Sequence, residues 1–127
     1  MIISHDLGTT GDKATLVSDD GEVLAAVTSS YGTEFGPRGK AEQDPEDWWS
    51  ALCAATQDLL RRASVRAEDI EVVSFSGQMM GAVLLDQAGA PVRPAIIWAD
   101  TRSVTQTATL VDRVGMAEGY KLSLIHI

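Results

Sequence analysis

The sequence contains a single cysteine, Cys53, and the lack of a second thiol excludes two kinds of structure. An intramolecular disulfide needs two cysteines, and a zinc site built on cysteine ligands needs more than one. Cys53 falls between apolar positions of an expected helix, so we interpret it as a buried, unreactive thiol. The fold therefore has to be held together by an ordinary apolar core.

Long apolar runs are lacking as well. No stretch approaches the about 18 consecutive apolar residues of a membrane span, and the N-terminus lacks the charged and apolar segments of a signal peptide. We therefore expect a cytoplasmic protein that does not interact with membranes. Apolar residues still make up 45% of the 127 residues, which is enough to build the core of one small domain.

Basic residues are scarce: ten Lys and Arg stand against eighteen Asp and Glu, and the formal net charge is -8. A surface of this charge repels the phosphate backbone of nucleic acids and the head groups of anionic membranes. We therefore expect neither as a partner. A basic pocket for a small anion such as a nucleotide remains compatible with this net charge.

The first thirty residues predict an antiparallel meander. The segments 1–6, 13–18 and 23–30 have the composition of strands, and short turns join them. The turn at 7–12 is rich in glycine, where a positive φ is expected. The Asp-Gly turn at 19–22 favours type I′ geometry.

A helix is predicted after a polar, Gly-rich loop at 31–43. Asp44 is placed to cap it and Pro45 suits its first turn. Thr56 interrupts the apolar face, and its hydroxyl can bond back to the preceding turn. The expected apolar face comprises Trp49, Leu52, Cys53, Leu59, Leu60 and Ala63.

Beyond this helix the pattern predicts a return to strands. The segment 70–76 is expected to lie parallel to its sheet neighbour, because a helical crossover leads to it. Further strands are predicted at 82–86 and around 95–98, and a second helix from about 101 toward 114. The pattern as a whole predicts an α/β fold with a mixed sheet.

The turn DLGTTGDK, residues 6–13, carries the strongest chemical pattern. A glycine turn between strands can direct N–H groups at an anion, while Thr9, Thr10 and Lys13 add hydroxyl donors and a positive charge. Asp6 can hold Mg²⁺ beside the phosphates, directly or through water. The pattern is typical of phosphoryl transfer. A simple hairpin whose Gly and Thr serve only the turn is the alternative.

Four segments in order resemble a known family. DLGTT at 6–10 resembles the first phosphate segment of the actin-like ATPase superfamily, which includes sugar kinases and chaperone ATPases. EQDPEDWW at 42–49, SFSGQMMG at 74–81 and PAIIWADTR at 94–102 resemble three segments of the xylulokinase-like FGGY carbohydrate kinases. Chaperone ATPases lack these three segments, so the chain is identified as a member of the kinase family, up to about Tyr120.

The resemblance implies a domain of the ribonuclease H-like (actin-like ATPase) fold that spans 1–121 and is truncated. This domain would be one lobe of a kinase that binds ATP, Mg²⁺ and a sugar. It is compatible with a homodimer of the full-length protein. Asp6 would be the catalytic residue in this chain, positioning Mg²⁺ and the transferred phosphate. The phosphate-binding residues would be Gly8, Thr9, Thr10 and Lys13, and the substrate-binding residues Gln78, Met79, Met80, Trp98, Asp100 and Arg102.

Several of these assignments have a plainer alternative. Met79 and Met80 can be core residues, since methionine fills irregular gaps. Asp100 and Arg102 can form a structural ion pair. Met80 also stands where many xylulokinases carry His, and methionine cannot donate a hydrogen bond to a sugar oxygen. The resemblance therefore leads us to expect D-xylulose or a related ketose, polyol or sugar acid as the substrate.

The family's general base, a second Asp, would lie after this chain, so we expect the 127-residue chain alone to be inactive. An actin- or chaperone-like ATPase and a non-catalytic sugar-binding domain remain alternatives. The tail at 122–127 fits the translation of a sequencing adapter, CTG TCT CTT ATA CAC ATC, and we expect it to be non-native. Otherwise it is a short apolar strand that continues the domain.

Overall fold

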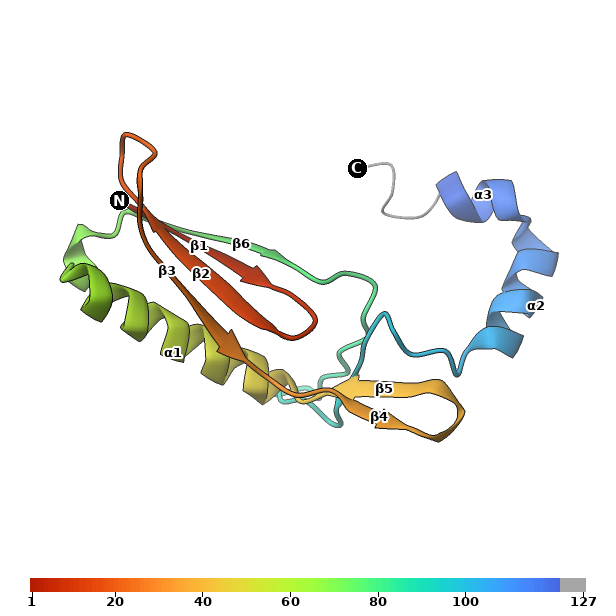
Figure 1. Ribbon diagram of the computed structural model, residues 1–127. Coiled ribbons are helices and arrows are strands. Elements are labelled where there is room, and N and C mark those ends of the chain that lie inside the picture. Colours follow the sequence, from red (N-terminus) through yellow and green to blue (C-terminus); the bar gives the residue numbers. More distant parts are fainter. Residues whose placement is uncertain (122–127) are drawn as a thin grey trace.

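A computed structural model describes residues 1–121 of the chain (Figure 1). The strands are β1 (Ile2–Leu7), β2 (Gly11–Val17), β3 (Val23–Ser30), β4 (Glu34–Gly36), β5 (Lys40–Gln43), β6 (Val72–Gly77) and β7 (Ala95–Ile96). The helices are α1 (Pro45–Ala63), α2 (Val104–Val114) and α3 (Met116–Lys121), with 3-10 turns at Pro37–Gly39 and Ala67–Asp69. The expected adapter-derived tail at 122–127 lies outside the described residues.

The main sheet has the strand order β3-β2-β1-β6. Strands β1, β2 and β3 pair antiparallel, whereas β6 pairs parallel to β1 after the crossover through α1. The predicted meander and parallel fourth strand are thus confirmed. Figure 1 shows α1 running along one face of the sheet. The core lies between them and consists of Ile3, Ala14, Leu16, Val27, Ala55 and Leu59.

Helix α1 begins as its sequence predicts, since the Asp44 carboxylate accepts from the Glu46 N–H at 3.0 Å. Thr56 donates to the Leu52 carbonyl at 2.8 Å, also as predicted. The expected apolar face is wrong in part, because Trp49 is 62% exposed and Cys53 is only half-buried. The buried face follows the small residues that let the helix approach the sheet closely: Ala51 and Ala55, with Leu59.

Three local expectations are corrected by the structure. The segment 31–43 is not a plain loop, because residues 34–43 fold into the β4–β5 hairpin, and β7 pairs with β5 in a second sheet. The turn at 19–22 is not type I′, since Gly21 has a positive φ but Asp20 does not. The segment 82–86 contributes only isolated bridges instead of a strand.

The C-terminal helices stand apart from the main sheet (Figure 1). The predicted second helix is present as α2, and the unforeseen α3 follows it after Gly115, whose φ of +83° a side chain would rarely adopt. No described residue of α2 or α3 is buried. Within residues 1–121, no helix combines the length and apolar character that crossing a bilayer requires.

A buried polar pair lies beneath the β1–β2 turn. His5 Nδ1 is 2.7 Å from Asp12 Oδ2, and the side chains are 1% and 0% exposed. His5 Nε2 is 3.3 Å from the Thr56 hydroxyl, which also donates to the Leu52 carbonyl. The burial of His5 identifies it as a packed residue of β1. The pair fastens the two strands of the turn to α1.

Removal of the helix cap gives a first testable expectation. We expect Asp44→Ala to lower the free energy of unfolding by about 1 kcal/mol, because the Glu46 N–H then has no side-chain acceptor. Gln57→Ala, on the exposed face of the same helix, is the matched control. Chemical denaturation of both variants measures the difference, and equal stabilities would show that the cap contributes nothing.

Candidate active site

The turn between β1 and β2 is closed by its own backbone. The Gly8 N–H donates to the Gly11 carbonyl at 3.0 Å, so in this structure it bonds within the turn. Neither glycine has a positive φ, contrary to expectation. Gly11 is needed for a different reason: a Cβ there would lie 2.7 Å from the Ser29 carbonyl oxygen of β3. The glycine therefore permits close approach of strands and does not provide a left-handed bend.

Tyr31 secures this turn from outside. Its hydroxyl donates to the Gly8 carbonyl at 2.5 Å. Burial raises the pKa of Tyr31, and the negative charges of Asp12 and Asp6 raise it further. The phenol therefore stays protonated and continues to donate at neutral pH. No local pattern in the sequence predicts this contact, because Tyr31 lies in a polar segment 23 residues from Gly8.

Asp6 and Lys13 are neighbours on the exposed face of the sheet. They are register partners across β1 and β2, and side chains of such partners point to the same face. Their burial alternates with that of His5 and Asp12, which point toward α1. A carboxylate and an ammonium group are thus presented together to solvent beside the turn.

The turn shares a pocket with two segments distant in sequence. A pocket of about 370 Å³ is lined by Asp6, Gly8, Thr9, Gly77, Gln78, Met79, Met80 and Trp98. The Trp98 indole N–H donates to the Thr9 hydroxyl at 3.0 Å and so joins the turn directly to the segment 94–102. The structure therefore brings part of the expected phosphate-binding set, Gly8 and Thr9, to one pocket with part of the expected substrate-binding set. Thr10 and Lys13 lie beside this pocket in the chain but do not line it.

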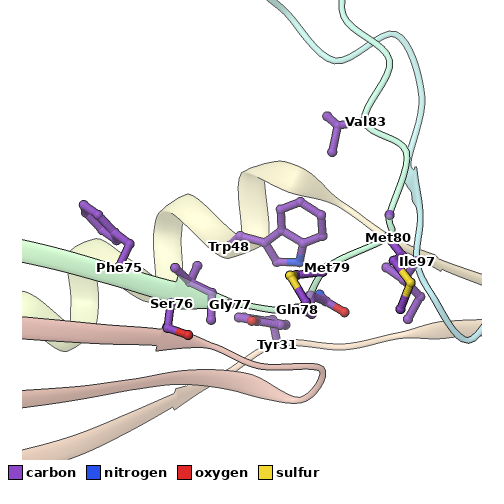
Figure 2. A pocket seen from close by; sticks show the side chains of 12 residues that line it. Tyr31, Trp48, Phe75, Ser76, Gly77, Gln78, Met79, Met80, Val83 and Ile97 are labelled. Atoms are coloured by element: carbon purple, nitrogen blue, oxygen red, sulfur yellow. The ribbon is translucent and has the colours of Figure 1, made fainter. Parts of the chain in front are cut away.

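A larger cavity of about 510 Å³ adjoins the same loop. Figure 2 shows Trp48 of α1 with Tyr31, Gln78 and Met79 at this cavity. Only one of the two adjacent tryptophans reaches it, because neighbouring helical residues point about 100° apart. Trp48 is half-buried here, whereas Trp49 faces solvent.

Met79 and Met80 are exposed, so they are not core residues. Met80 also has a φ of +63°, in the left-handed region that non-glycine residues seldom adopt. Gly77 and Gly81 on either side have no positive φ. Methionine therefore occupies the one left-handed position of this loop, with its side chain directed to the two cavities.

Gln43 connects the β1–β2 turn, α1 and the methionine loop, residues 78–81. Its Nε2 donates to the Thr9 carbonyl and to the Thr33 hydroxyl, both at 2.7 Å. Its Oε1 accepts from the Trp48 indole at 2.9 Å and from Gln78 Nε2 at 2.7 Å. The residue is buried, so this set of bonds is shielded from water.

Asp100 and Arg102 form a structural network behind the pocket. Asp100 accepts from the Ala41 N–H at 2.9 Å and from Arg102 Nε at 2.8 Å, and its side chain is 5% exposed. Arg102 also reaches Glu42 at 2.5 Å, and Arg93 bonds the same carboxylate. Neither Asp100 nor Arg102 lines the pocket that contains Asp6.

The charges in this network reinforce one another. The hydrogen bond from Arg102 holds the pKa of Asp100 well below its ordinary value, although burial opposes the shift. The pKa of Glu42 is lowered by Arg102 first, and then by the charges of Arg93 and Lys40. Both carboxylates therefore stay ionised, and they fasten the segment 93–102 to β5.

The described residues offer a limited set of metal ligands. No group of three or more His, Cys, Asp or Glu in 1–121 is arranged to hold a metal ion. Mg²⁺ in phosphoryl-transfer sites usually keeps several waters and takes one or two carboxylates plus the substrate phosphates. The single exposed carboxylate of Asp6, beside the turn, fits that mode of binding.

Sequence reasoning missed Tyr31 and the roles of Gln43 and Trp48. Gln43 stands inside EQDPEDWW, a segment matched by resemblance without a function for its amide. The one usable signal was its position directly before the helix cap Asp44. Its four partners come from 5 to 35 residues away, so no local pattern could reveal them.

The meander, the parallel fourth strand after a helix and the acidic residue before the Gly-Thr turn define a domain of the actin-like ATPase fold. The chain belongs to the FGGY family of carbohydrate kinases, because the family's N-terminal domain model matches residues 1–127.

Individual relatives agree with this assignment. The xylulose kinases of Bacillus subtilis and Escherichia coli are each 40% identical over 114 residues, covering 90% of this chain and 23% of theirs. The crystal structure of xylulose kinase from Rhodospirillum rubrum has a TM-score of 0.79 at 32% identity, covering 88% of this chain and 23% of that one.

A gluconate kinase has a similar structure. The crystal structure from Lactobacillus acidophilus gives a TM-score of 0.85 at 27% identity and covers 94% of this chain and 24% of that one. The chain thus spans about a quarter of the length of the curated relatives it matches.

Proposed function

We propose that the complete protein transfers the γ-phosphoryl group of ATP to a hydroxyl of D-xylulose or a related ketose, polyol or sugar acid. The observation that carries this proposal is the pocket shared by Asp6 and the Gly8-Thr9 turn with the methionine loop and Trp98. Phosphoryl transfer requires the nucleotide phosphates and the acceptor hydroxyl to meet in line. A common pocket for both groups of residues supports that geometry.

On the nucleotide side, the residues of this chain hold and orient the phosphates of ATP. Thr9 and Thr10 supply hydroxyl donors, Lys13 supplies positive charge, and Gly8 shapes the turn. Asp6 would hold Mg²⁺, directly or through water. Bound there, Mg²⁺ would neutralise charge on the transferred phosphoryl group. The exposed Asp6 and Lys13 on one sheet face support these roles.

On the sugar side, the pocket combines apolar surface with few polar groups. Met79, Met80 and the Trp98 ring would contact the C–H faces of the sugar, and Gln78 would contact its hydroxyls. Asp100 and Arg102 would brace the segment that carries Trp98. Their mutual ion pair and the bond to the Ala41 N–H support this indirect role.

We further propose that the domain spans 1–121, that 122–127 are non-native, and that this chain alone does not phosphorylate sugars. Among residues 1–121, Asp6 is the only carboxylate that lines the shared pocket. With Asp6 assigned to the metal, no second carboxylate of that pocket can accept the proton of the attacking hydroxyl. General-base catalysis contributes about 10²–10⁴-fold, so its loss is decisive. The genomic sequence beyond Tyr120 tests the tail assignment.

A coupled assay of ADP release tests the function directly. We expect the complete protein to turn over ATP in the presence of one member of a panel of D-xylulose, other ketoses, polyols and gluconate, and the 127-residue chain to show no sugar-dependent turnover. Light scattering on the same preparation tests the expected homodimer. Peptide-stimulated hydrolysis instead would identify a chaperone-like ATPase, and sugar binding without turnover a non-catalytic domain. Sugar-dependent turnover by the 127-residue chain would show that the base assignment is wrong.

A further inference from the structure

Gln43 is a buried amide whose hydrogen-bonding capacity is completely used. It is 3% exposed. An amide can donate two hydrogen bonds and accept two, and Gln43 does so with four partners. The donated bonds go to the Thr9 carbonyl and the Thr33 hydroxyl, and the accepted bonds come from Trp48 and Gln78.

The partners fix the orientation of this amide. The Trp48 indole nitrogen can only donate, so it must face Oε1 of Gln43. The Thr9 carbonyl can only accept, so it must face Nε2. Rotating the amide by 180° would oppose donor to donor and acceptor to acceptor. Gln43 therefore has one allowed arrangement as long as Thr9, Trp48 and Gln78 stay in place.

Two of these partners belong to different halves of the pocket. Thr9 is in the phosphate turn, and its hydroxyl receives the Trp98 indole N–H. Gln78 begins the methionine loop and lines both cavities. The Gln43 amide thus connects the turn to the methionine loop through a single residue. It donates to the Thr9 carbonyl on one side and accepts from Gln78 Nε2 on the other.

We propose that Gln43 is a positioning residue that couples nucleotide binding to sugar binding. This inference rests on the proposed function. A nucleotide that orders the turn also orders Gln43, and Gln43 in turn holds Gln78 in the loop that faces the sugar. The second ligand then binds elements that the first has already ordered, which produces positive cooperativity. By linkage, the sugar tightens nucleotide binding by the same factor.

The test uses Gln43→Glu and Gln43→Met in the complete protein. Glutamate can still accept from Trp48 and Gln78, but its carboxylate cannot donate to the Thr9 carbonyl. Methionine has similar length and no hydrogen bond to either side. Titration calorimetry measures the dissociation constant of D-xylulose, or of the panel sugar that supports turnover, with and without a non-hydrolysable ATP analogue and Mg²⁺.

We expect the analogue to tighten sugar binding by about 5-fold or more in the wild type, within the usual range of coupling between sites, and by less than about 2-fold in both variants. The ratio of the sugar dissociation constants without and with the analogue measures the coupling. Gln57→Glu makes the same chemical change on the exposed face of α1 and should keep the wild-type value of this ratio. A purely structural role of Gln43 would weaken each ligand without changing the ratio. Melting curves of each variant show whether it is folded.

The outcomes separate the inference from the function on which it rests. A wild type that binds both ligands with a ratio near one overturns the coupling alone, and this measurement does not depend on the folding of any variant. A wild-type ratio in folded Gln43→Met also overturns it. A wild type that binds neither ATP analogue nor any panel sugar overturns the proposed function, and the coupling with it.

Discussion

Replacing Asp6 with asparagine in the complete protein is expected to lower kcat for sugar phosphorylation by about 10²–10³-fold, the range found when one group that stabilises transition-state charge is removed. Asparagine keeps the size of the side chain but loses the negative charge that would hold Mg²⁺ beside the phosphates. Because Asp6 is exposed, the free energy of unfolding should change by less than about 0.5 kcal/mol. Asp6→Asn is therefore expected to lose activity while it keeps the stability of the wild type.

Steady-state kinetics on Asp6→Asn, with denaturation as a parallel measurement, checks this expectation. Asp20→Asn is the matched control, since it removes the same charge from the exposed turn between β2 and β3. It should leave kcat unchanged. If Asp6→Asn keeps the wild-type kcat, Asp6 is not part of the catalytic site. A large loss of stability would mean that its role is structural.

The second large effect is expected on stability, at the buried pair His5 and Asp12. We expect His5→Ala to lower the free energy of unfolding by about 3 kcal/mol, because it leaves a buried polar group without its hydrogen-bond partner. The Asp12 carboxylate would then be buried without its Nδ1 partner. Its Oδ1 already has no hydrogen-bond partner among the described residues, so no other group there can compensate.

The double variant His5→Leu with Asp12→Val should recover most of that loss. Replacing both partners of a buried pair by apolar residues is often neutral or stabilising. Thr56 would still donate to the Leu52 carbonyl, so its hydroxyl would not be left unsatisfied. Chemical denaturation followed by tryptophan fluorescence compares the three proteins. A double variant as unstable as His5→Ala would show that the pair itself is not the source of the effect.

Elements that depend on short segments of sequence, such as single strands, turns and a helix cap, could be predicted from those segments alone. The meander follows from short apolar segments between turns, and the start of α1 follows from Asp44 and Pro45. The β4–β5 hairpin was missed because 31–43 is polar and lacks alternation. Its partner is β7, some 50 residues further on. The buried face of α1 was assigned in part wrongly, because close packing on the sheet favoured Ala51 and Ala55 over larger residues.

The residues of the candidate site could be predicted in part, whereas the contacts between them could not. The turn with Asp6 was recognisable from its residue types, and the resemblance supplied Met79, Met80 and Trp98 before the structure brought them to one pocket. The links between these groups were not predictable. The Trp98–Thr9 bond spans 89 residues, and such contacts arise only from tertiary packing. The same holds for the amide of Gln43.

The left-handed backbone at Met80 restricts how this pocket can diverge. At a φ of +63°, side chains branched at Cβ meet the backbone, so Val, Ile and Thr are disfavoured there. Asn, Asp and His tolerate the conformation better than most residues. Substrate preference at this position can therefore evolve by exchanging thioether, imidazole, amide or carboxylate groups. Substitution by small side chains branched at Cβ is disfavoured by the backbone conformation.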